Sequence, residues 1–315
     1  MRLLIVKTTS MGDVVHAVPV IDDIRKHFPD AEIDWLVEGS FADIPRNVQG
    51  VSEVIVCSVR QWKKRLAKRQ TWSEIKDLKA KLRAKHYDLV IDLQGLIKSA
   101  VLASWTGAVV CGYDRQSIKE RIATVLYQRK YAISREKSAV ERCRLLAAKS
   151  LGYDPGNTRP QFSFKPSGKP ALKGAVIFFC NTSRDTKLWP EQKWVQVGRS
   201  IVEQGRQIIL PWGSEEEHQR VGRIAKAIGA AAFVPERMPI GKLMELLGEA
   251  YAVIGLDTGM THLSSAMGLP TVGIFRDYPV ELVPLEGAAK KAALGGVACC
   301  PEVKDVLSAY QKVTQ

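Results

Sequence analysis

The chain has 315 residues, of which 46% are hydrophobic and 25% are charged. This composition is typical of a folded globular protein and excludes a disordered chain, and the length favours two domains of roughly 150 residues each. Most of the formal net charge of +13 lies in the first half, because residues 1–155 carry 27 basic against 18 acidic residues and residues 156–315 carry 19 against 15. Such a surface favours an anionic partner, whether nucleic acid, acidic lipid or phosphorylated glycan.

The first half alternates strand-like apolar runs with segments of helical period. The apolar run after Arg2 is shorter than a signal peptide requires, so we expect a first strand there. An uncharged stretch, residues 99–113, is broken by Gly107 and falls short of the roughly 20 residues of a membrane-spanning helix. Strands are predicted at about 2–7, 32–37, 53–57, 88–92 and 108–112, and helices at about 13–28, 71–85, 97–106, 117–128 and 138–151.

A stretch rich in proline and glycine, residues 152–170, predicts a linker, and the same alternation resumes after it. Here strands are predicted at about 174–180, 207–211, 231–234, 251–256 and 270–275, and helices at about 190–204, 215–228, 240–249 and 259–267. The pattern predicts an α/β protein of two doubly wound, Rossmann-like domains facing each other across a cleft. We expect an N-terminal domain at 1–155, a C-terminal domain at 156–300, and a last helix, 301–315, that packs back on the N-terminal domain.

Six cysteines are scattered without a C-x-x-C pair, and several lie in apolar runs where a thiol packs as a small hydrophobic group. We interpret them as reduced, in a cytoplasmic protein. The adjacent Cys299 and Cys300 suggest a metal or redox site, but no histidine lies nearby in the sequence, so we do not assign one.

The turn after the first predicted strand carries the best candidate for a general base. Gly12 permits close approach of the backbone to a ligand, and Asp13 is a carboxylate at the carboxyl end of a strand, where α/β sheets bind their ligands. Asp13 could instead be only a helix cap, and a helix N-terminus lowers basicity. His16, one turn later, is either a second polar group of the site or a core histidine.

Three loops of the second half are suited to a nucleotide. In residues 181–190, Thr182 and Ser183 can donate hydrogen bonds to a diphosphate and Lys187 can act as a point charge, although an ordinary solvated turn is the alternative. Residues 213–217 end in three glutamates, which either complement a helix dipole or include one acceptor for ribose hydroxyls. The segment 251–275 predicts a βαβ unit whose turn, Asp257-Thr258-Gly259, presents a helix N-terminus to a phosphate.

The densest charge run, residues 60–69, contains six cations and no acid, with Trp62 and Leu66 one turn apart. A solvated helix face is one interpretation, and an anionic, partly lipidic binding surface is the other, which we favour. Neither G-x-G-x-x-G after a strand nor G-x-x-x-x-G-K-[ST] occurs, and D-x-D, H-E-x-x-H and Cys/His metal spacings are absent from the sequence. We therefore expect no metal and no cofactor.

Five ordered motifs closely resemble those of the lipopolysaccharide heptosyltransferases, and together they cover nearly the whole chain. They are Lys7-Thr-Thr-Ser-Met-Gly-Asp13, Asp92-Leu-Gln-Gly-Leu-Ile-Lys98-Ser, Thr182-Ser-Arg-Asp-Thr-Lys187-Leu-Trp-Pro190, Pro211-Trp-Gly-Ser214 and Asp257-Thr-Gly-Met-Thr-His262. The resemblance implies the GT-B fold and an inverting, metal-independent transfer of heptose from ADP-L-glycero-β-D-manno-heptose to the Kdo residue of Kdo2-lipid A. It also implies a cytoplasmic enzyme held peripherally on the inner membrane.

Carried over motif by motif, the resemblance implies a role for each candidate residue. Asp13 would be the base that deprotonates the Kdo hydroxyl. Donor contacts would come from Thr182, Ser183, Lys187, Glu217, Asp257, Thr258, Gly259 and His262, of which Glu217 would meet the ribose. Acceptor contacts would come from Ser10, Gly12, Arg60, Lys63, Lys64, Lys98, Lys119 and Arg121.

The resemblance has two departures and leaves alternatives. After the last predicted donor strand the chain continues Phe275-Arg276-Asp277-Tyr278-Pro279, where the family usually has a Gly-Pro-Thr-like loop, and the part around Cys299 and Cys300 matches poorly. A heptosyltransferase acting further out on the core, another GT-B enzyme such as a sugar-nucleotide epimerase, and a basic protein that binds nucleotides or nucleic acid without catalysis remain as alternatives. No nucleic-acid-binding motif supports the last of these.

Overall fold

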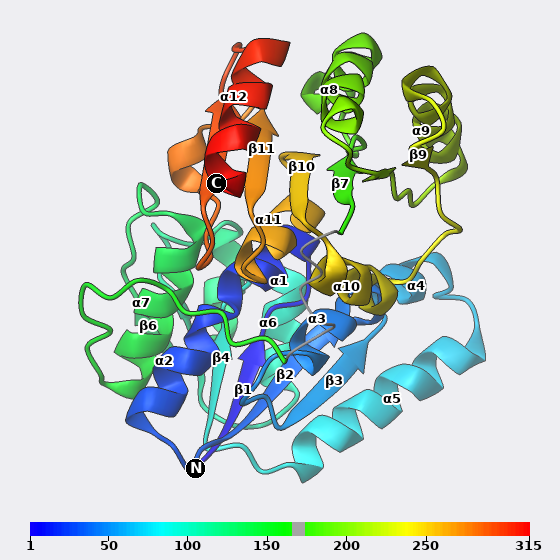
Figure 1. Ribbon diagram of the computed structural model, residues 1–315. Helices are drawn as coiled ribbons and strands as arrows, with labels where there is room; N and C mark the ends of the chain where they lie inside the picture. Colours follow the sequence, from blue (N-terminus) through cyan, green and yellow to red (C-terminus); the bar gives the residue numbers. More distant parts are fainter. Residues whose placement is uncertain (166–173) are drawn as a thin grey trace. The chain divides into compact units, whose positions relative to one another are not determined.

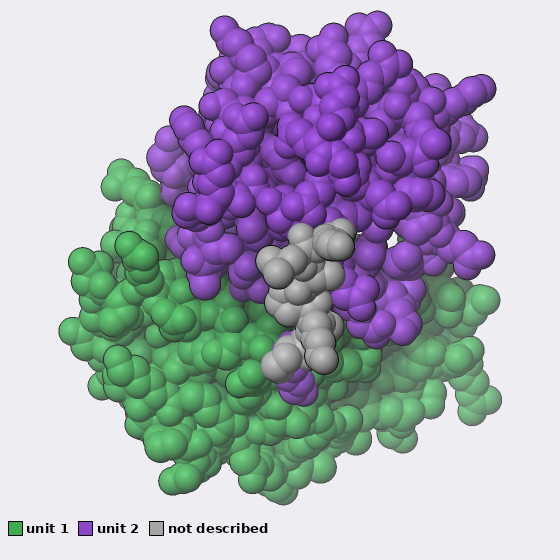
Figure 2. All heavy atoms as spheres, in the orientation of Figure 1, with its two compact units in different colours: residues 1–164 green, residues 165–315 purple. Residues whose placement is uncertain are grey.

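The computed structural model of the protein describes residues 1–165 and 174–315 (Figure 1). These residues form two compact units, Met1–Phe164 (unit 1) and Lys165–Gln315 (unit 2), coloured separately in Figure 2. Unit 1 extends beyond the predicted boundary at residue 155, because the Gln49 N–H donates to the Ser163 carbonyl (2.7 Å) and the Ser163 N–H donates to Asp22 (3.2 Å). The predicted linker residues 166–170 lie outside the described residues.

Unit 1 is built on a six-stranded parallel sheet of order β3-β2-β1-β4-β5-β6. Its strands other than β6 are largely apolar, as expected where helices cover both faces of a sheet, and they confirm the predicted alternation. The edge strand β6 is polar and largely exposed, and the sequence analysis missed it. The strands are β1 Arg2–Val6, β2 Glu32–Glu38, β3 Glu53–Cys57, β4 Leu89–Asp92, β5 Val110–Tyr113 and β6 Arg129–Tyr131. The α-helices are α1 Met11–Ala17, α2 Pro19–His27, α3 Asp43–Arg46, α4 Val59–Lys64, α5 Arg69–Ala84, α6 Ile97–Ser104 and α7 Ala139–Leu151.

Two predicted helices of unit 1 differ from the structure. The helix predicted at 13–28 is divided into α1 and α2, because Pro19 has no N–H to continue the first helix and begins the second. The helix predicted at 117–128 is wrong: a turn leads into the short 3₁₀ helix η2, Arg121–Leu126. Its Ile122 and Val125 are 71% and 80% exposed and only Ala123 and Thr124 are buried, so this segment lacks the wide apolar stripe of an amphipathic helix.

Tyr127, the residue after η2, connects this segment to the sheet. Its ring lies over Gly112 in β5, where a β-carbon would come within 2.2 Å of a ring carbon. The missing side chain of Gly112 thus makes room for the ring. Through that space the Tyr127 hydroxyl donates to the buried carboxylate of Asp92 at 2.6 Å.

Unit 2 is built on a second six-stranded parallel sheet, of order β12-β11-β10-β7-β8-β9. The strands are β7 Val176–Phe179, β8 Ile208–Ile209, β9 Ala232–Phe233, β10 Ala252–Leu256, β11 Thr271–Phe275 and β12 Lys291–Gly295. The α-helices are α8 Glu191–Glu203, α9 Glu215–Ile228, α10 Ile240–Glu249, α11 Gly259–Ala266 and α12 Val303–Thr314. Short 3₁₀ helices are η1 Gly39–Phe41 in unit 1 and η3 Asp185–Lys187 and η4 Val280–Leu282 in unit 2.

The last helix, α12, belongs to unit 2, which corrects the prediction that it packs on the N-terminal domain. It lies along β11 and β12 (Figure 1), and its buried Val306, Ala309, Tyr310 and Val313 join the core formed with Trp189 and Trp194. The apolar stripe of α12 is buried there because β12, which the sequence analysis missed, extends the sheet beneath it. Across residues 1–165 and 174–315, no helix combines the length and apolar character needed to cross a membrane.

Candidate functional site

The predicted site residues of unit 1 follow the carboxyl ends of neighbouring strands. In a parallel sheet these ends meet at one edge, where α/β proteins bind ligands. Asp13 follows β1, Arg60 follows β3, Lys98 follows β4 and Lys119 follows β5, and these strands belong to one sheet. The topology therefore gathers, at one edge, residues that are more than 100 positions apart in sequence.

Asp13 lies in the first turn of α1 and forms the cap that the sequence analysis raised as an alternative to catalysis. Its Oδ2 atom accepts hydrogen bonds from both the backbone N–H and the hydroxyl of Ser10, each at 2.8 Å. Among the described residues, nothing donates to its Oδ1 atom. One oxygen thus fixes the carboxylate, while the other is available to accept a proton from a ligand.

The electrostatic surroundings keep Asp13 ionised. Burial favours the neutral acid, but the positive charge of Lys7, the two hydrogen bonds from Ser10 and the charge of His16 outweigh it and lower the pKa of Asp13. Lys7 is buried, and its ammonium donates to the Leu93 carbonyl at 2.8 Å. A carboxylate with a lowered pKa is a weak base, so it would accept a proton only from a group that is already becoming more acidic.

Gln94 is a positioning residue that the sequence analysis missed. Its Oε1 atom accepts the backbone N–H groups of both Thr8 and Thr9 at 2.9 Å, in the turn that leads to Asp13. Gln94 is held in turn by Asp92, whose Oδ1 atom accepts the Gln94 N–H at 2.9 Å. Burial raises the pKa of Asp92 although Tyr127 and other groups donate to it. The quoted Asp92-to-Lys98 motif contained the signal, but only Lys98 was selected from it.

The predicted acceptor residues divide into a part-buried one and exposed ones. Lys98 donates to the Thr9 hydroxyl at 2.7 Å, so it lies on the turn before Asp13. Burial lowers the pKa of Lys98, and the neighbouring charges of Arg60 and Lys63 lower it further, against opposing effects of Glu38 and Cys57. Exposed members are Arg60, Lys63, Lys64, Lys119, Arg121 and Ser10, and Gly12 is half-buried in α1.

The basic run of α4 differs in detail from the predicted amphipathic surface. Trp62 is only 7% exposed, and its indole N–H donates to Glu74 at 2.9 Å, so it is part of the core rather than of an exposed apolar seam. The exposed apolar side chains here are Leu66 and Trp72, at 53% and 58%. The Trp72 indole N–H donates to the Leu66 carbonyl at 2.9 Å, which holds the two residues together amid the cations.

In unit 2 the predicted donor residues form a charged cluster around Asp257, which follows β10. The Lys187 ammonium donates to Asp257 Oδ2 at 2.5 Å, and His262 Nε2 lies 3.2 Å from Oδ1. Burial raises the pKa of Asp257, but the hydrogen bonds from His262 and Lys187 and their charges dominate and lower it. Lys187 and Asp257 are 70 positions apart and meet because β7 pairs directly with β10.

The remaining predicted phosphate contacts lie in the same two loops, after β7 and after β10. Helix α11 begins at Gly259, as predicted, so its first N–H groups are directed outward from the turn after Asp257. The Thr258 hydroxyl lies 3.4 Å from that of Thr261. Within the described part of the chain, no hydrogen bond engages the side chains of Thr182 and Ser183, which follow β7.

Glu217 forms a hydrogen-bonded cap at the start of α9, a role that neither of its two sequence interpretations named. Its Oε2 atom accepts the backbone N–H groups of Gly213 (2.7 Å) and Ser214 (3.3 Å), and the Ser214 hydroxyl accepts the Glu217 N–H. Glu217 thereby fixes the loop after β8. Glu215 and Glu216 are exposed, so Glu217 is the one of the three acids that is tied to the loop.

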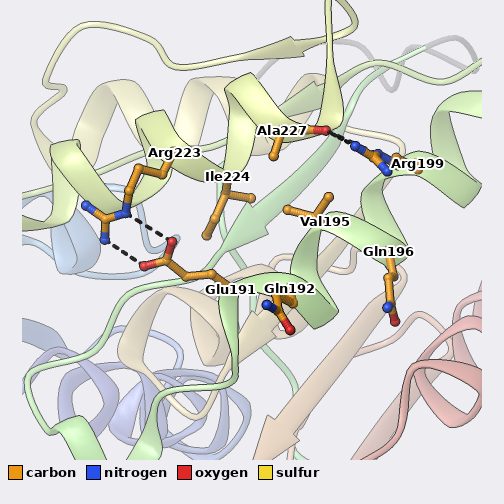
Figure 3. Close-up of a pocket in the computed structure, with 8 residues that line it drawn as sticks. All are labelled: Glu191, Gln192, Val195, Gln196, Arg199, Arg223, Ile224 and Ala227. Carbon is orange, nitrogen blue, oxygen red and sulfur yellow. Dashed lines mark hydrogen bonds and ion pairs between the residues drawn. The ribbon is translucent and has the colours of Figure 1, made fainter.

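A groove of about 440 Å³ between α8 and α9 is separate from these residues (Figure 3). Its charged groups are paired within the protein, since Arg223 binds Glu191 through two hydrogen bonds and Arg199 donates to the Ala227 carbonyl. None of the predicted site residues lines it. The described residues contain no group of three or more His, Cys, Asp or Glu side chains arranged to hold a metal ion.

Comparison with known proteins identifies one family. Residues 75–311 match the family described as glycosyltransferase family 9 (heptosyltransferase). The chain is 38% identical to lipopolysaccharide heptosyltransferase 1 of Pseudomonas aeruginosa, covering 87% of this chain and 78% of the relative. It is 34% identical to lipopolysaccharide heptosyltransferase 1 of Salmonella typhimurium, covering 99% of this chain and all of the relative.

Among solved structures, that of the E. coli heptosyltransferase WaaC with ADP matches with a TM-score of 0.89 and 34% identity. The match covers 99% of this chain and 98% of the other. Together with the two parallel six-stranded sheets, it confirms the predicted α/β fold class and GT-B fold. The resemblance drawn from the five motifs is likewise confirmed.

Proposed function

This chain belongs to glycosyltransferase family 9, the heptosyltransferases, and we propose that it transfers heptose from ADP-heptose to the Kdo residue of Kdo2-lipid A. The observation that carries the proposal is the cluster of Lys187, Asp257 and His262 at the start of α11. A cation and a helix N-terminus attract a diphosphate, and the same groups stabilise the charge that develops when ADP departs.

Asp13 is the base in this proposal. The Oδ2 atom stays on Ser10, and Oδ1 accepts the proton of the attacking Kdo hydroxyl while the bond from heptose to ADP breaks. Attack from the face opposite to the leaving diphosphate inverts the anomeric centre. The leaving group is stabilised by Lys187 and by the N–H groups at the start of α11, so the reaction requires no metal ion. Thr182 and Ser183 donate to the phosphates, and Glu217 accepts a ribose hydroxyl through Oε1.

Positive charge at the edge of unit 1 suits the acceptor, whose carboxylates and phosphates are anionic. Lys98 donates to the hydroxyl of Thr9, in the turn that precedes Asp13. The exposed cations of α4 and of the η2 segment extend the same charge outward. Arg60 is oriented over the Phe41 ring at 5.3 Å, which limits its freedom before the acceptor binds.

The same surface would hold the enzyme peripherally on the cytoplasmic face of the inner membrane. Exposed Leu66 and Trp72 stand among six cations, a combination that suits the boundary between anionic headgroups and acyl chains. We expect the protein to float with vesicles containing anionic lipid and to remain behind with vesicles of neutral lipid. Equal recovery with both would remove the membrane contact from the proposal.

A mass-spectrometric transfer assay with ADP-heptose and Kdo2-lipid A tests the reaction, with EDTA present to test the metal independence. We expect one added heptose with the wild type. Asp13→Ala and Asp13→Asn should abolish transfer while ADP binding, measured by calorimetry, stays near that of the wild type. Mass gain only on an already heptosylated acceptor would reassign the acceptor, and loss of ADP binding with retained turnover would contradict the roles given to the two units.

A further inference from the structure

The loop after β11 is the part of the chain that the proposed function leaves without a role. It begins with Arg276 and Asp277, at one of the two places where the chain departs from the family pattern. Because β11, β10 and β7 are adjacent in the sheet, this loop emerges at the same edge as Asp257 and the 181–188 loop. Both side chains contact the residues around Lys187.

Asp277 places a second carboxylate on Lys187. Its Oδ2 atom accepts a hydrogen bond from the Thr186 hydroxyl at 2.8 Å, and its Oδ1 atom lies 3.7 Å from the Lys187 ammonium. That separation is too long for a hydrogen bond, and the buried Oδ1 atom has no hydrogen-bond partner among the described residues. The Asp257 bond to the same ammonium is 2.5 Å, so the contact with Asp277 is the looser of the two.

Arg276 supplies a second cation at the same loop. Its Nη1 group donates to the carbonyl of Leu188, the residue after Lys187, and the side chain is half-buried. In the part of the chain that the structure describes, its other guanidinium N–H groups have no acceptor. A guanidinium fixed by one backbone carbonyl and retaining several unused donors has the geometry that binds phosphate oxygens in pairs.

The charges of this cluster explain how the two residues would act. Lys187 and Arg276 carry two positive charges, and Asp257 and Asp277 carry two negative charges, so the four groups sum to zero. A diphosphate brings further negative charge, and it gains net attraction only when one carboxylate ceases to occupy Lys187. Asp277 is the one suited to do so, because its contact with Lys187 is long and Thr186 can retain it.

We propose that Arg276 and Lys187 together bind the diphosphate of the donor, and that Asp277 competes with this diphosphate for Lys187. The inference rests on the proposed function, since it deepens the donor site of that reaction. It assigns a binding role to Arg276 and makes Asp277 a residue that weakens donor affinity.

Calorimetric titration of the full chain with ADP, AMP and adenosine tests the proposal. Arg276→Met should weaken ADP binding by about tenfold, the effect of losing a charge-assisted hydrogen bond, and leave adenosine binding within about twofold of the wild type. Arg276→Lys should retain only part of the ADP affinity, because it keeps the positive charge but loses the paired N–H donors of the guanidinium group. Asp277→Asn should tighten ADP binding by about threefold to tenfold. Arg199→Met, which removes a cation held on the Ala227 carbonyl in another part of unit 2, is the matched control and should bind ADP like the wild type.

Three results would overturn the proposal: wild-type ADP affinity in Arg276→Met, an equal loss for adenosine and ADP in that variant, or weaker ADP binding in Asp277→Asn. The second would mean that Arg276 only supports the fold of the loop. Failure of the proposed function can be distinguished from failure of this inference. A wild-type protein that binds ADP with the expected variant pattern but transfers no heptose leaves this inference standing, whereas a wild-type protein that does not bind ADP removes both.

Discussion

Replacing Gln94 tests whether the turn before Asp13 is held from β4. Gln94→Leu has nearly the same shape but cannot accept the N–H groups of Thr8 and Thr9, both at 2.9 Å in the wild type. Thr8 and Thr9 are buried, so their N–H groups would find no water in exchange. The turn would then relax away from the position in which Ser10 orients Asp13.

The magnitude follows from the number of groups left unsatisfied. Each buried donor without a partner costs about 1–3 kcal/mol, so two cost about 2–6 kcal/mol; because the turn can relax, we expect about 3 kcal/mol in the free energy of unfolding of unit 1. For a unit of this size, that corresponds to a fall of roughly 6–12 °C in Tm. Displacement of the base by a fraction of an ångström to one ångström should lower kcat by about 100-fold.

The informative comparison is with Gln94→Glu, measured by calorimetric unfolding and by transfer rate against pH. The glutamate can still accept both N–H groups, so stability should be largely retained. Its negative charge should raise the pKa of Asp13 and move the acid limb of kcat/KM to higher pH. A Gln94→Leu protein with wild-type Tm and kcat would refute the reasoning, as would a Gln94→Glu profile that coincides with the wild type.

Three other expectations follow from contacts already described. Lys7→Met removes the charge that most lowers the pKa of Asp13, so the acid limb of the pH–rate profile should move to higher pH while activity above that limb recovers. An unmoved limb would exclude Lys7 as the cause of the lowered pKa. The folded pKa of Asp257 lies below the ordinary value of 3.8, so the ionised carboxylate stabilises the fold fully above about pH 4 and less as the pH falls through the folded pKa. The free energy of unfolding of Asp257→Asn should therefore fall less on acidification than that of the wild type. Parallel curves for the two proteins would contradict this. Tyr310→Ala should cost unit 2 about 3–5 kcal/mol in urea unfolding without altering unit 1, whereas a change confined to unit 1 would contradict the placement of α12.

The elements that could be predicted are those whose pattern is local. The periods of β1, β10 and α11 and the turn at Asp257 are visible in a few consecutive residues, and all were found within one or two residues of their ends. Strand β12 was not predicted because its alanines and glycine have low strand propensity, and it forms by pairing with β11.

Site contacts were harder to predict when they depended on pairing between distant segments. The ion pair of Lys187 with Asp257 requires knowledge that β7 and β10 are neighbours. The support of Thr8 and Thr9 by Gln94 requires that β1 and β4 are neighbours. The capping role of Asp13 was anticipated from spacing alone, because a cap is formed within four residues. The hydrogen-bonded cap formed by Glu217 was not, since its place in a first helical turn had suggested only a dipole complement or a ribose contact. The position of α12 depended on a strand that was missed.

Gly112 shows how far the demands of the reaction reach into the scaffold. The glycine admits the Tyr127 ring, Tyr127 binds Asp92, and Asp92 orients the residue that supports the turn before Asp13. An alanine at this position would add a single carbon inside a strand, at a residue with no proposed ligand contact of its own. If Asp13 is the base that we propose, the effect of this alanine should nevertheless appear in the transfer rate as well as in the stability of unit 1. Redesign of this sheet for stability would have to keep glycine at residue 112, as it would keep a residue of the active site.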